Sequence, residues 1–192
     1  KELGSLLIGM RSRNLKSINT VTVVECSETQ AKDLAAQIAA AWNVNALAWS
    51  LERLEEPARG LIIATYFHYN EILQRWPQRF PEMHFAAIQP DPAMPRKLFS
   101  RGMPHHKTTL FLCEWDDSMA SNIATELAVL FPMERFSIER RITRSPASLL
   151  RSKSKIPVLF SPRMWGQLTP AQRRNPRAFE IRYVFVPEDL QM

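Results

Sequence analysis

A strand, a tight turn and a helix between Thr20 and Trp42 most constrain how this chain can fold. Residues 20–26 are largely β-branched and apolar, as in strands that are buried on both faces of a parallel sheet. Ser27 is a suitable N-cap for the helix that follows, in which apolar residues recur at helical spacing from Ala31 onward. This pattern is the first half of a βαβ unit, so we expect a mostly parallel sheet covered by helices.

The same pattern occurs again about 90 residues later in the chain. A predicted strand at 108–114 precedes a cap at Asp116 or Asp117 and a second amphipathic helix. Predicted strands at 61–65 and 157–161 extend the correspondence, because each precedes a helix. The apolar positions of the two helices align without gaps, with Ala31, Leu34, Ala35, Ile38 and Ala39 matching Ala120, Ile123, Ala124, Leu127 and Ala128. We therefore predict an internal structural duplication.

Alternating strands and helices of this length predict an α/β fold with two similar βαβ-type lobes, mostly parallel sheets and a cleft between the lobes. Each lobe is expected to close with a strand, at 84–89 and at 179–186, and a helix is predicted at 164–174. The predicted ranges are a linker helix at 1–19 from a missing upstream domain, a first lobe at 20–92, a crossover at 93–106 and a second lobe at 107–192.

Composition limits the class of protein. The 192 residues are 45% hydrophobic, which suffices to bury a substantial core. No apolar run is long enough to cross a bilayer and no signal-peptide cleavage pattern is present, so a cytoplasmic location is expected. The two cysteines lack a CxxC spacing and indicate reduced thiols, with a redox role left open. Histidines without metal-ligand spacing and the absence of a glycine-rich phosphate loop predict neither metal nor cofactor.

Polar residues gather at four predicted strand ends. Ligands of parallel sheets bind beyond the carboxyl ends of the strands, where free N–H groups at helix N-termini suit a polar or anionic ligand. Helix capping alone is the competing explanation for Ser27, Thr65 and Asp116. The candidate ligand-binding residues of the cleft are Glu25, Cys26, Ser27, Thr65, His68, Glu114, Ser161 and Arg163.

A cysteine in each half is similar to the paired thiols of cofactor-independent amino-acid racemases. Two features oppose this enzyme alternative: Cys113 precedes its predicted strand end by one residue, and no second racemase motif occurs. We expect no catalytic residues, while a racemase-like enzyme and a stand-alone small-molecule binding module remain the alternatives.

The net charge of +6 is concentrated in residues 135–182, which contain Glu139 and Glu180 as their acidic residues. No helix-turn-helix, zinc finger or RNP pattern accompanies the basic residues, so contact with an acidic protein and a solvated surface compete with nucleic-acid binding. The candidate partner-binding residues are Arg140, Arg141, Arg144, Arg151, Arg173 and Arg174. An apolar stripe near the N-terminus predicts dimerisation through Leu3, Leu6, Leu7 and Met10.

Two segments of the first half carry a family resemblance. Residues 24–31 (Val-Glu-Cys-Ser-Glu-Thr-Gln-Ala) and 64–72 (Ala-Thr-Tyr-Phe-His-Tyr-Asn-Glu-Ile) resemble paired motifs in the effector domains of GntR-family transcription regulators, of the PlmA type found in cyanobacteria. The resemblance extends with less specificity through 112–114 and 182–185. Ser27 stands where the family usually has Asn, and Ser161 lies in a variable place, so the identity of any ligand is open.

The resemblance implies a dimeric, non-enzymatic regulator without a cofactor. It implies contact with DNA through a winged-helix domain upstream of Lys1, and an effector domain in the present chain. For the PlmA type it further implies a protein partner, namely the nitrogen-signalling PII protein with its small adaptor PipX.

Overall fold

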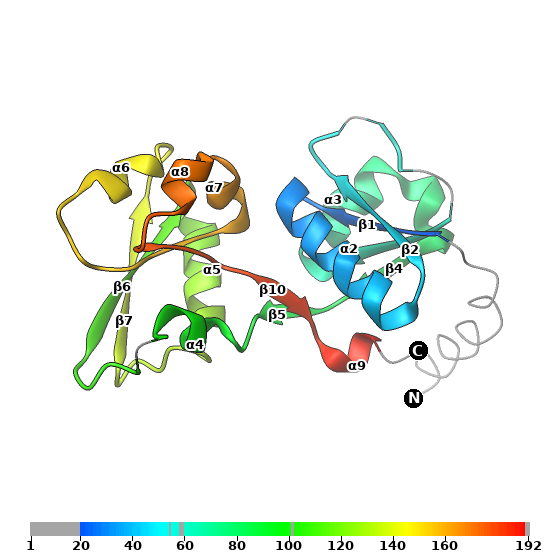
Figure 1. The fold of residues 1–192 in the computed structure, drawn as a ribbon. Coiled ribbons are helices and arrows are strands. Elements are labelled where there is room, and N and C mark those ends of the chain that lie inside the picture. The colour runs from blue at the N-terminus through cyan, green and yellow to red at the C-terminus, as the bar shows by residue number, and fades with distance from the viewer. Residues whose placement is uncertain (1–19, 54, 58–59, 101, 191–192) are drawn as a thin grey trace. The chain divides into compact units, whose positions relative to one another are not determined.

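A computed structural model describes residues 20–53, 55–57, 60–100 and 102–190 (Figure 1). The chain divides into two compact units: unit 1 contains residues up to 88 together with the segment from 184 onward, and unit 2 contains residues 89–183. The predicted α/β class is confirmed, because each unit contains a four-stranded parallel sheet with helices between its strands. The predicted linker helix and the dimerisation residues Leu3, Leu6, Leu7 and Met10 lie outside the described residues.

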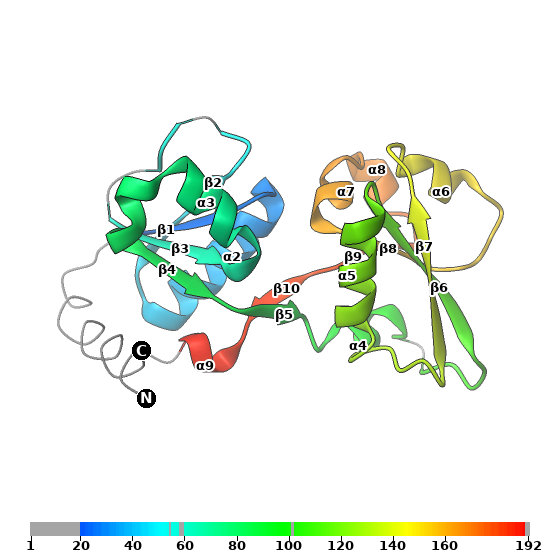
Figure 2. The ribbon, with the colours of Figure 1, turned by 180° about the vertical axis from the view of Figure 1, so that it is seen from behind.

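Unit 1 has a parallel sheet with the strand order β2-β1-β3-β4. Its strands are β1 (Thr20–Glu25), β2 (Asn45–Ser50), β3 (Leu61–Thr65) and β4 (Met83–Ala86). Its helices are α2 (Glu28–Trp42), the 3-10 helices η2 (Tyr66–His68) and η3 (Pro77–Glu82), α3 (Tyr69–Arg75) and α9 (Pro187–Leu190). Helices α2 and α3 cover opposite faces of this sheet (Figures 1 and 2).

The continuous apolar run of β1 follows from this layering. Val21 and Val23 pack with Leu34 of α2 on one face, whereas Val24 packs with Ile72 of α3 on the other. Both side-chain directions of the strand are therefore buried, as expected for a central parallel strand. The predicted start of α2 is also confirmed, because the Ser27 hydroxyl accepts a hydrogen bond from the backbone N–H of the third helical residue at 3.5 Å.

Unit 2 has the strand order β7-β6-β8-β9, which matches unit 1 when β6 is paired with β1 and β8 with β3. Its strands are β6 (Thr108–Glu114), β7 (Phe136–Ile142), β8 (Val158–Phe160) and β9 (Ala178–Glu180). Its helices are α4 (Met94–Leu98), α5 (Asp117–Leu127), α6 (Ala147–Arg151), α7 (Pro162–Gly166) and α8 (Pro170–Arg173). The common strand order agrees with the predicted structural duplication. Asp116, rather than Asp117, caps α5 by accepting from the Met119 N–H at 2.8 Å.

Three predicted elements are divided in the structure. The helix expected at 164–174 is interrupted, because Thr169 and Gln172 form a capping box that starts the separate helix α8. The strand expected at 179–186 is split into β9 and β10 (Tyr183–Phe185), and that at 84–89 into β4 and β5 (Ile88–Pro90). Strands β5 and β10 pair with each other in a two-stranded sheet.

The unit boundaries differ from the predicted lobes. Met94 in the predicted crossover is buried, and Phe99 stacks on Phe136 with ring centroids 5.5 Å apart, so this segment belongs to unit 2. Phe185 is buried in the core of unit 1, which therefore includes a segment from the far end of the sequence. None of the helices within the described ranges is long and apolar enough to span a membrane.

Candidate functional site

The carboxyl edge of the unit 1 sheet carries a cluster of polar side chains. Glu25 ends β1 and Thr65 ends β3, and the parallel register of the two strands places these positions next to each other. Cys26 follows Glu25 directly, while the turn η2 begins immediately after Thr65 and ends at His68. Four predicted ligand-binding residues therefore come from two adjacent strand ends.

Glu25 and His68 are in direct contact although 43 positions separate them in the sequence. The Nε2 atom of His68 lies 3.0 Å from Oε2 of Glu25, whose side chain is 1% exposed. The other ring nitrogen, Nδ1, lies 3.6 Å from Oε2 of Glu71, one helical turn further on. The imidazole is thus held between a buried and an exposed carboxylate.

The protonation state of His68 follows from this environment. Burial lowers the pKa of His68, but hydrogen bonds to Cys26 and Glu25 and the charge of Glu25 outweigh this effect and raise the pKa to about 10. At neutral pH the side chain is therefore an imidazolium, and its charge compensates the buried carboxylate.

Two buried oxygen atoms of this edge lack a hydrogen-bond partner among the described residues. They are Oε1 of Glu25 and Oγ1 of Thr65, and each side chain belongs to a residue that is 1% exposed. An unpaired buried acceptor costs about 1–3 kcal/mol. An ordered water or a bound ion would supply the partner that such an atom needs.

Aromatic side chains lie beside the cluster, and the sequence analysis missed them. Tyr66 and Phe67 of η2 are 60% and 61% exposed, and Tyr69 packs on Phe85 with ring centroids 4.7 Å apart. Exposed aromatic surface next to buried polar groups is typical of binding sites. The run of three aromatic residues around His68 was the available signal. Glu71 was also missed as a site residue, although its three-residue spacing from His68 places it on the same helical face.

The matching edge of unit 2 contains Glu114, Ser161 and Arg163 but no comparable cluster among the described residues. Glu114 is buried and accepts a hydrogen bond from the backbone N–H of Trp115 at 2.7 Å. Arg163 lies over the ring of Trp115 at 4.1 Å, and Ser161 caps α7. Met164 follows Ser161 by the three positions that separate His68 from Thr65, so no imidazole occupies the equivalent place.

The two cysteines occupy different environments. Cys26 is partly exposed, whereas Cys113 is fully buried inside β6. Burial, together with the charge of Glu114, raises the pKa of Cys113 to about 12. Of the two cysteines, only Cys26 therefore belongs to the polar cluster. Ser27 keeps its role as the cap of α2, in agreement with the competing explanation for that residue.

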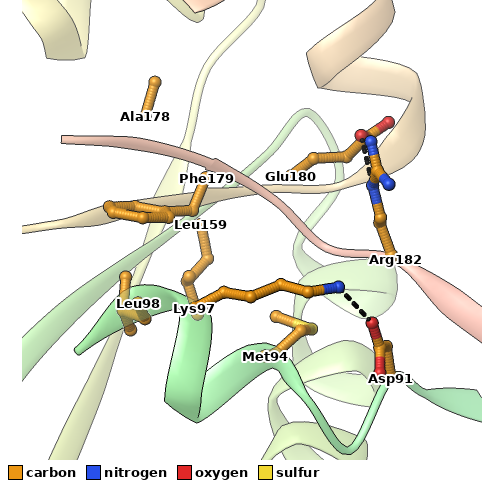
Figure 3. A pocket seen from close by; sticks show the side chains of 9 residues that line it. All are labelled: Asp91, Met94, Lys97, Leu98, Leu159, Ala178, Phe179, Glu180 and Arg182. Carbon is orange, nitrogen blue, oxygen red and sulfur yellow. Dashed lines mark hydrogen bonds and ion pairs between the residues drawn. The ribbon is translucent and has the colours of Figure 1, made fainter. Parts of the chain in front are cut away.

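A separate pocket of about 330 Å³ lies within unit 2 (Figure 3). Apolar side chains and two ion pairs line it: Lys97 Nζ lies 2.8 Å from Asp91, and Arg182 Nε lies 3.1 Å from Glu180. The complete lining is Asp91, Met94, Lys97, Leu98, Leu159, Ala178, Phe179, Glu180 and Arg182. None of the predicted site residues lines this pocket.

The predicted partner-binding arginines all belong to unit 2. Arg140 pairs with Asp117 at 3.3 Å, and Arg141 pairs with Glu139 at 2.6 Å. Arg144, Arg151 and Arg174 are exposed, while Arg173 is half-buried and donates to the Gly166 carbonyl. Five of these six side chains, all except Arg173, are exposed or paired only with a carboxylate at the surface, so the surface retains a positive charge.

Comparisons of the chain with models of protein families, with curated proteins and with solved structures found no match. The resemblance to GntR-family effector domains therefore depends on the residues of the two motifs at 24–31 and 64–72. Glu25, Cys26 and His68, which form the cluster in unit 1, come from these same two motifs.

Proposed function

We propose that this chain is the effector-sensing and dimerisation domain of a GntR-type transcription regulator. The observation that supports this function best is the contact between Glu25 and His68, because it joins the two motifs that carry the resemblance. A buried carboxylate and a perturbed histidine at the carboxyl edge of a parallel sheet are features of functional sites. A shared role in ligand binding, in addition to their roles in the fold, would then explain why the two motifs occur together.

The unit 1 cluster is suited to a small polar effector. His68 offers a positive charge, the unpartnered oxygen of Glu25 accepts a hydrogen bond, and the exposed rings of Tyr66 and Phe67 offer apolar contact. The N-terminus of α2, which is fifteen residues long, adds a favourable field for an anionic group at the same edge. An effector of this kind would bind unit 1 and change the equilibrium between states of the regulator.

The second input in this proposal is an acidic protein that docks on the basic surface of unit 2. Exposed Arg144, Arg151 and Arg174 are accompanied by exposed Lys153 and Lys155. Charge complementarity of this sort speeds association and makes it sensitive to salt. The resemblance identifies the PII protein with PipX as the partner to test.

The test is a binding titration of PII with PipX against the chain at several salt concentrations. Charge reversal at Arg140, Arg141 and Arg144 should weaken binding by about tenfold or more, which corresponds to about 1.4 kcal/mol, and should flatten the salt dependence. Reversal of three basic residues elsewhere, Lys32, Arg96 and Lys107, is the matched control. The docking proposal would be contradicted if charge reversal left both affinity and salt dependence unchanged while substitution of Thr65 and His68 abolished binding. That result would favour a ligand-gated site.

The transcription part of the proposal has its own test. The chain alone should bind operator DNA no better than random duplex in a gel-shift assay, since phosphate contacts carry no sequence information. It should also be dimeric by light scattering at roughly tens of micromolar, the range for dimers of ordinary affinity. Sequence-specific binding by the chain, or a monomer, would contradict the corresponding part of the proposal.

The racemase-like alternative is less well supported. It requires a thiol from each half as acid and base, whereas Cys113 is fully buried and its pKa is raised to about 12. A thiol in that environment is protonated at neutral pH and has no contact with solvent. The environment of Cys113 therefore does not favour a paired-thiol mechanism.

A further inference from the structure

Three side chains with different metal-binding atoms meet at the carboxyl edge of the unit 1 sheet. They are the carboxylate of Glu25, the thiol of Cys26 and the imidazole of His68, and their ligand atoms all lie within 4.8 Å of one another. Glu25 and His68 are largely buried, with side chains 1% and 14% exposed. Cys26 is partly exposed, which leaves the cluster a route to solvent.

The separations in this cluster fit a tetrahedral metal ion. Zinc binds nitrogen and oxygen at about 2.0–2.2 Å and sulfur at about 2.3 Å, so its ligand atoms lie about 3.3–3.6 Å apart. The separation between Glu25 Oε2 and His68 Nε2 is 3.0 Å, and the cluster extends to 4.8 Å at most. Small side-chain rotations would bring all three atoms to zinc-binding distances.

Two further observations indicate a bound cation. Oε1 of Glu25 is buried and has no partner in the described part of the chain, so a cation would supply what this oxygen lacks. Glu71 lies 3.6 Å from Nδ1 of His68, on the side of the ring away from Glu25. A carboxylate at Nδ1 directs Nε2 of a histidine towards a metal and makes it a stronger ligand.

We propose that unit 1 binds one divalent transition-metal ion, zinc by its ligand preference, through Nε2 of His68, Sγ of Cys26 and the carboxylate of Glu25. A thiolate, an imidazole and a carboxylate together select zinc over calcium or magnesium. Three protein ligands leave a fourth position open, as in zinc sites that bind a further molecule. The expectation of no metal came from spacing along the sequence, which cannot detect ligands 42 positions apart. This inference does not depend on the transcription proposal. In the metal-bound state the ion, instead of the His68 imidazolium, would supply the positive charge for an anionic effector.

Metal binding has to displace protons from the cluster. Zinc binds a neutral imidazole and a thiolate, so Nε2 of His68, which contacts Glu25 in the metal-free protein, has to be free of a proton before it can bind the ion. Metal binding is therefore coupled to the release of protons. The affinity should decrease as the pH is lowered.

Unit 2 provides an internal comparison. Glu114 ends β6 as Glu25 ends β1, but Trp115 replaces the cysteine and Met164 replaces the histidine at the matching positions. Neither replacement offers the imidazole or thiolate that zinc requires. We therefore expect one ion per chain.

The experiment uses the whole 192-residue chain after treatment with a chelator. Titration with zinc should give one site per chain and, in buffers of different ionisation enthalpy, a net release of protons. Titration with cobalt(II) should produce the near-ultraviolet charge-transfer band of a cobalt–thiolate bond. Absence of that band from the wild-type chain would overturn the proposal and leave the cluster a hydrogen-bonded ion pair.

Substitutions assign the ligands. Cys26→Ser should remove the cobalt band and weaken zinc binding by at least about tenfold, and Glu71→Gln should keep the band and weaken binding by about 10–100-fold. Cys113→Ala is the thiol control and should keep both properties. The exposed neighbours His105 and His106 could bind zinc non-specifically, so a double variant with Gln at both positions is a second control. It should change neither the cobalt band nor the zinc affinity. Equal zinc affinity of the wild type and Cys26→Ser, or loss of binding in the His105 and His106 variant, would refute the assignment.

Discussion

Replacement of His68 by Gln should destabilise the protein at neutral pH, and the effect should decrease as the pH rises. Glu25 is 1% exposed and relies on the His68 imidazolium for charge compensation. Removal of one member of a buried ion pair costs about 3–5 kcal/mol, because the remaining charge stays buried without a partner.

The pH dependence has a definite sign. Folding raises the pKa of His68 from 6.5 to about 10, so the native state binds the proton more tightly than the unfolded state. The resulting stabilisation is fully present below about pH 6.5 and is lost as the pH rises through about 10, with a slope of about 1.4 kcal/mol per pH unit between them. The His68 side chain is 14% exposed, so solvent screens little of this stabilisation. The difference in unfolding free energy between wild type and His68→Gln should therefore shrink by about 2–3 kcal/mol from pH 7 to pH 9.

Urea unfolding at several pH values measures this difference. A chelator must be present so that bound metal ions do not contribute to the measured stability, and Cys26 stays in both proteins because its hydrogen bond helps to raise the pKa of His68. His105→Gln, at an exposed position in unit 2, is the control and should follow the wild type at each pH. Parallel stability curves for wild type and His68→Gln between pH 7 and pH 9 would show that His68 does not titrate as the buried ion pair requires.

Two other predictions concern single side chains. Iodoacetamide should modify Cys26 in the native protein and Cys113 only after unfolding, because burial and the charge of Glu114 raise the pKa of Cys113 to about 12; equal rates by peptide mass spectrometry would contradict this. Arg79 is 6% exposed, donates to the Pro57 carbonyl at 2.7 Å and pairs with Glu82 at 2.8 Å, so Arg79→Ala should lower the unfolding free energy by about 2–3 kcal/mol. In urea denaturation, a loss below about 1 kcal/mol, the range of exposed ion pairs, would show that this contact is dispensable.

Regular elements with a clear pattern could be predicted from the sequence. Strand β1 has an uninterrupted apolar run, and helix α2 has a side-chain cap at Ser27 and apolar residues at helical spacing. These local signals agree with the way the two elements pack in the sheet. The break before α8 was not predicted, because the apolar spacing continues across it while Thr169 and Pro170 start a new helix.

The sequence could predict that the candidate site lies at the carboxyl edge of a parallel sheet, but it could not predict which side chains contact one another there. Parallel strands bring Glu25 and Thr65 to the same end of a sheet, and this follows from topology alone. The contact between Glu25 and His68 depends on the tight turn η2, which folds the chain back after β3. No periodic pattern encodes that turn, so the sequence predicted Glu25, Cys26 and His68 as site residues but predicted neither their ion pair nor a metal site.

The division of unit 1 into two separate stretches of sequence affects how the protein is synthesised and folds. Phe185 belongs to the core of unit 1, its N–H donates to the Gln37 side chain at 3.0 Å, and Asp189 accepts from the Ala87 N–H at 2.6 Å. On the ribosome, unit 2 is therefore complete before unit 1 can close, although unit 1 begins first. A chain truncated after Tyr183 should retain unit 2 but leave the core of unit 1 without its last hydrophobic side chain. Unit 1 would consequently be exposed to chaperones and proteases for longer than unit 2 during synthesis.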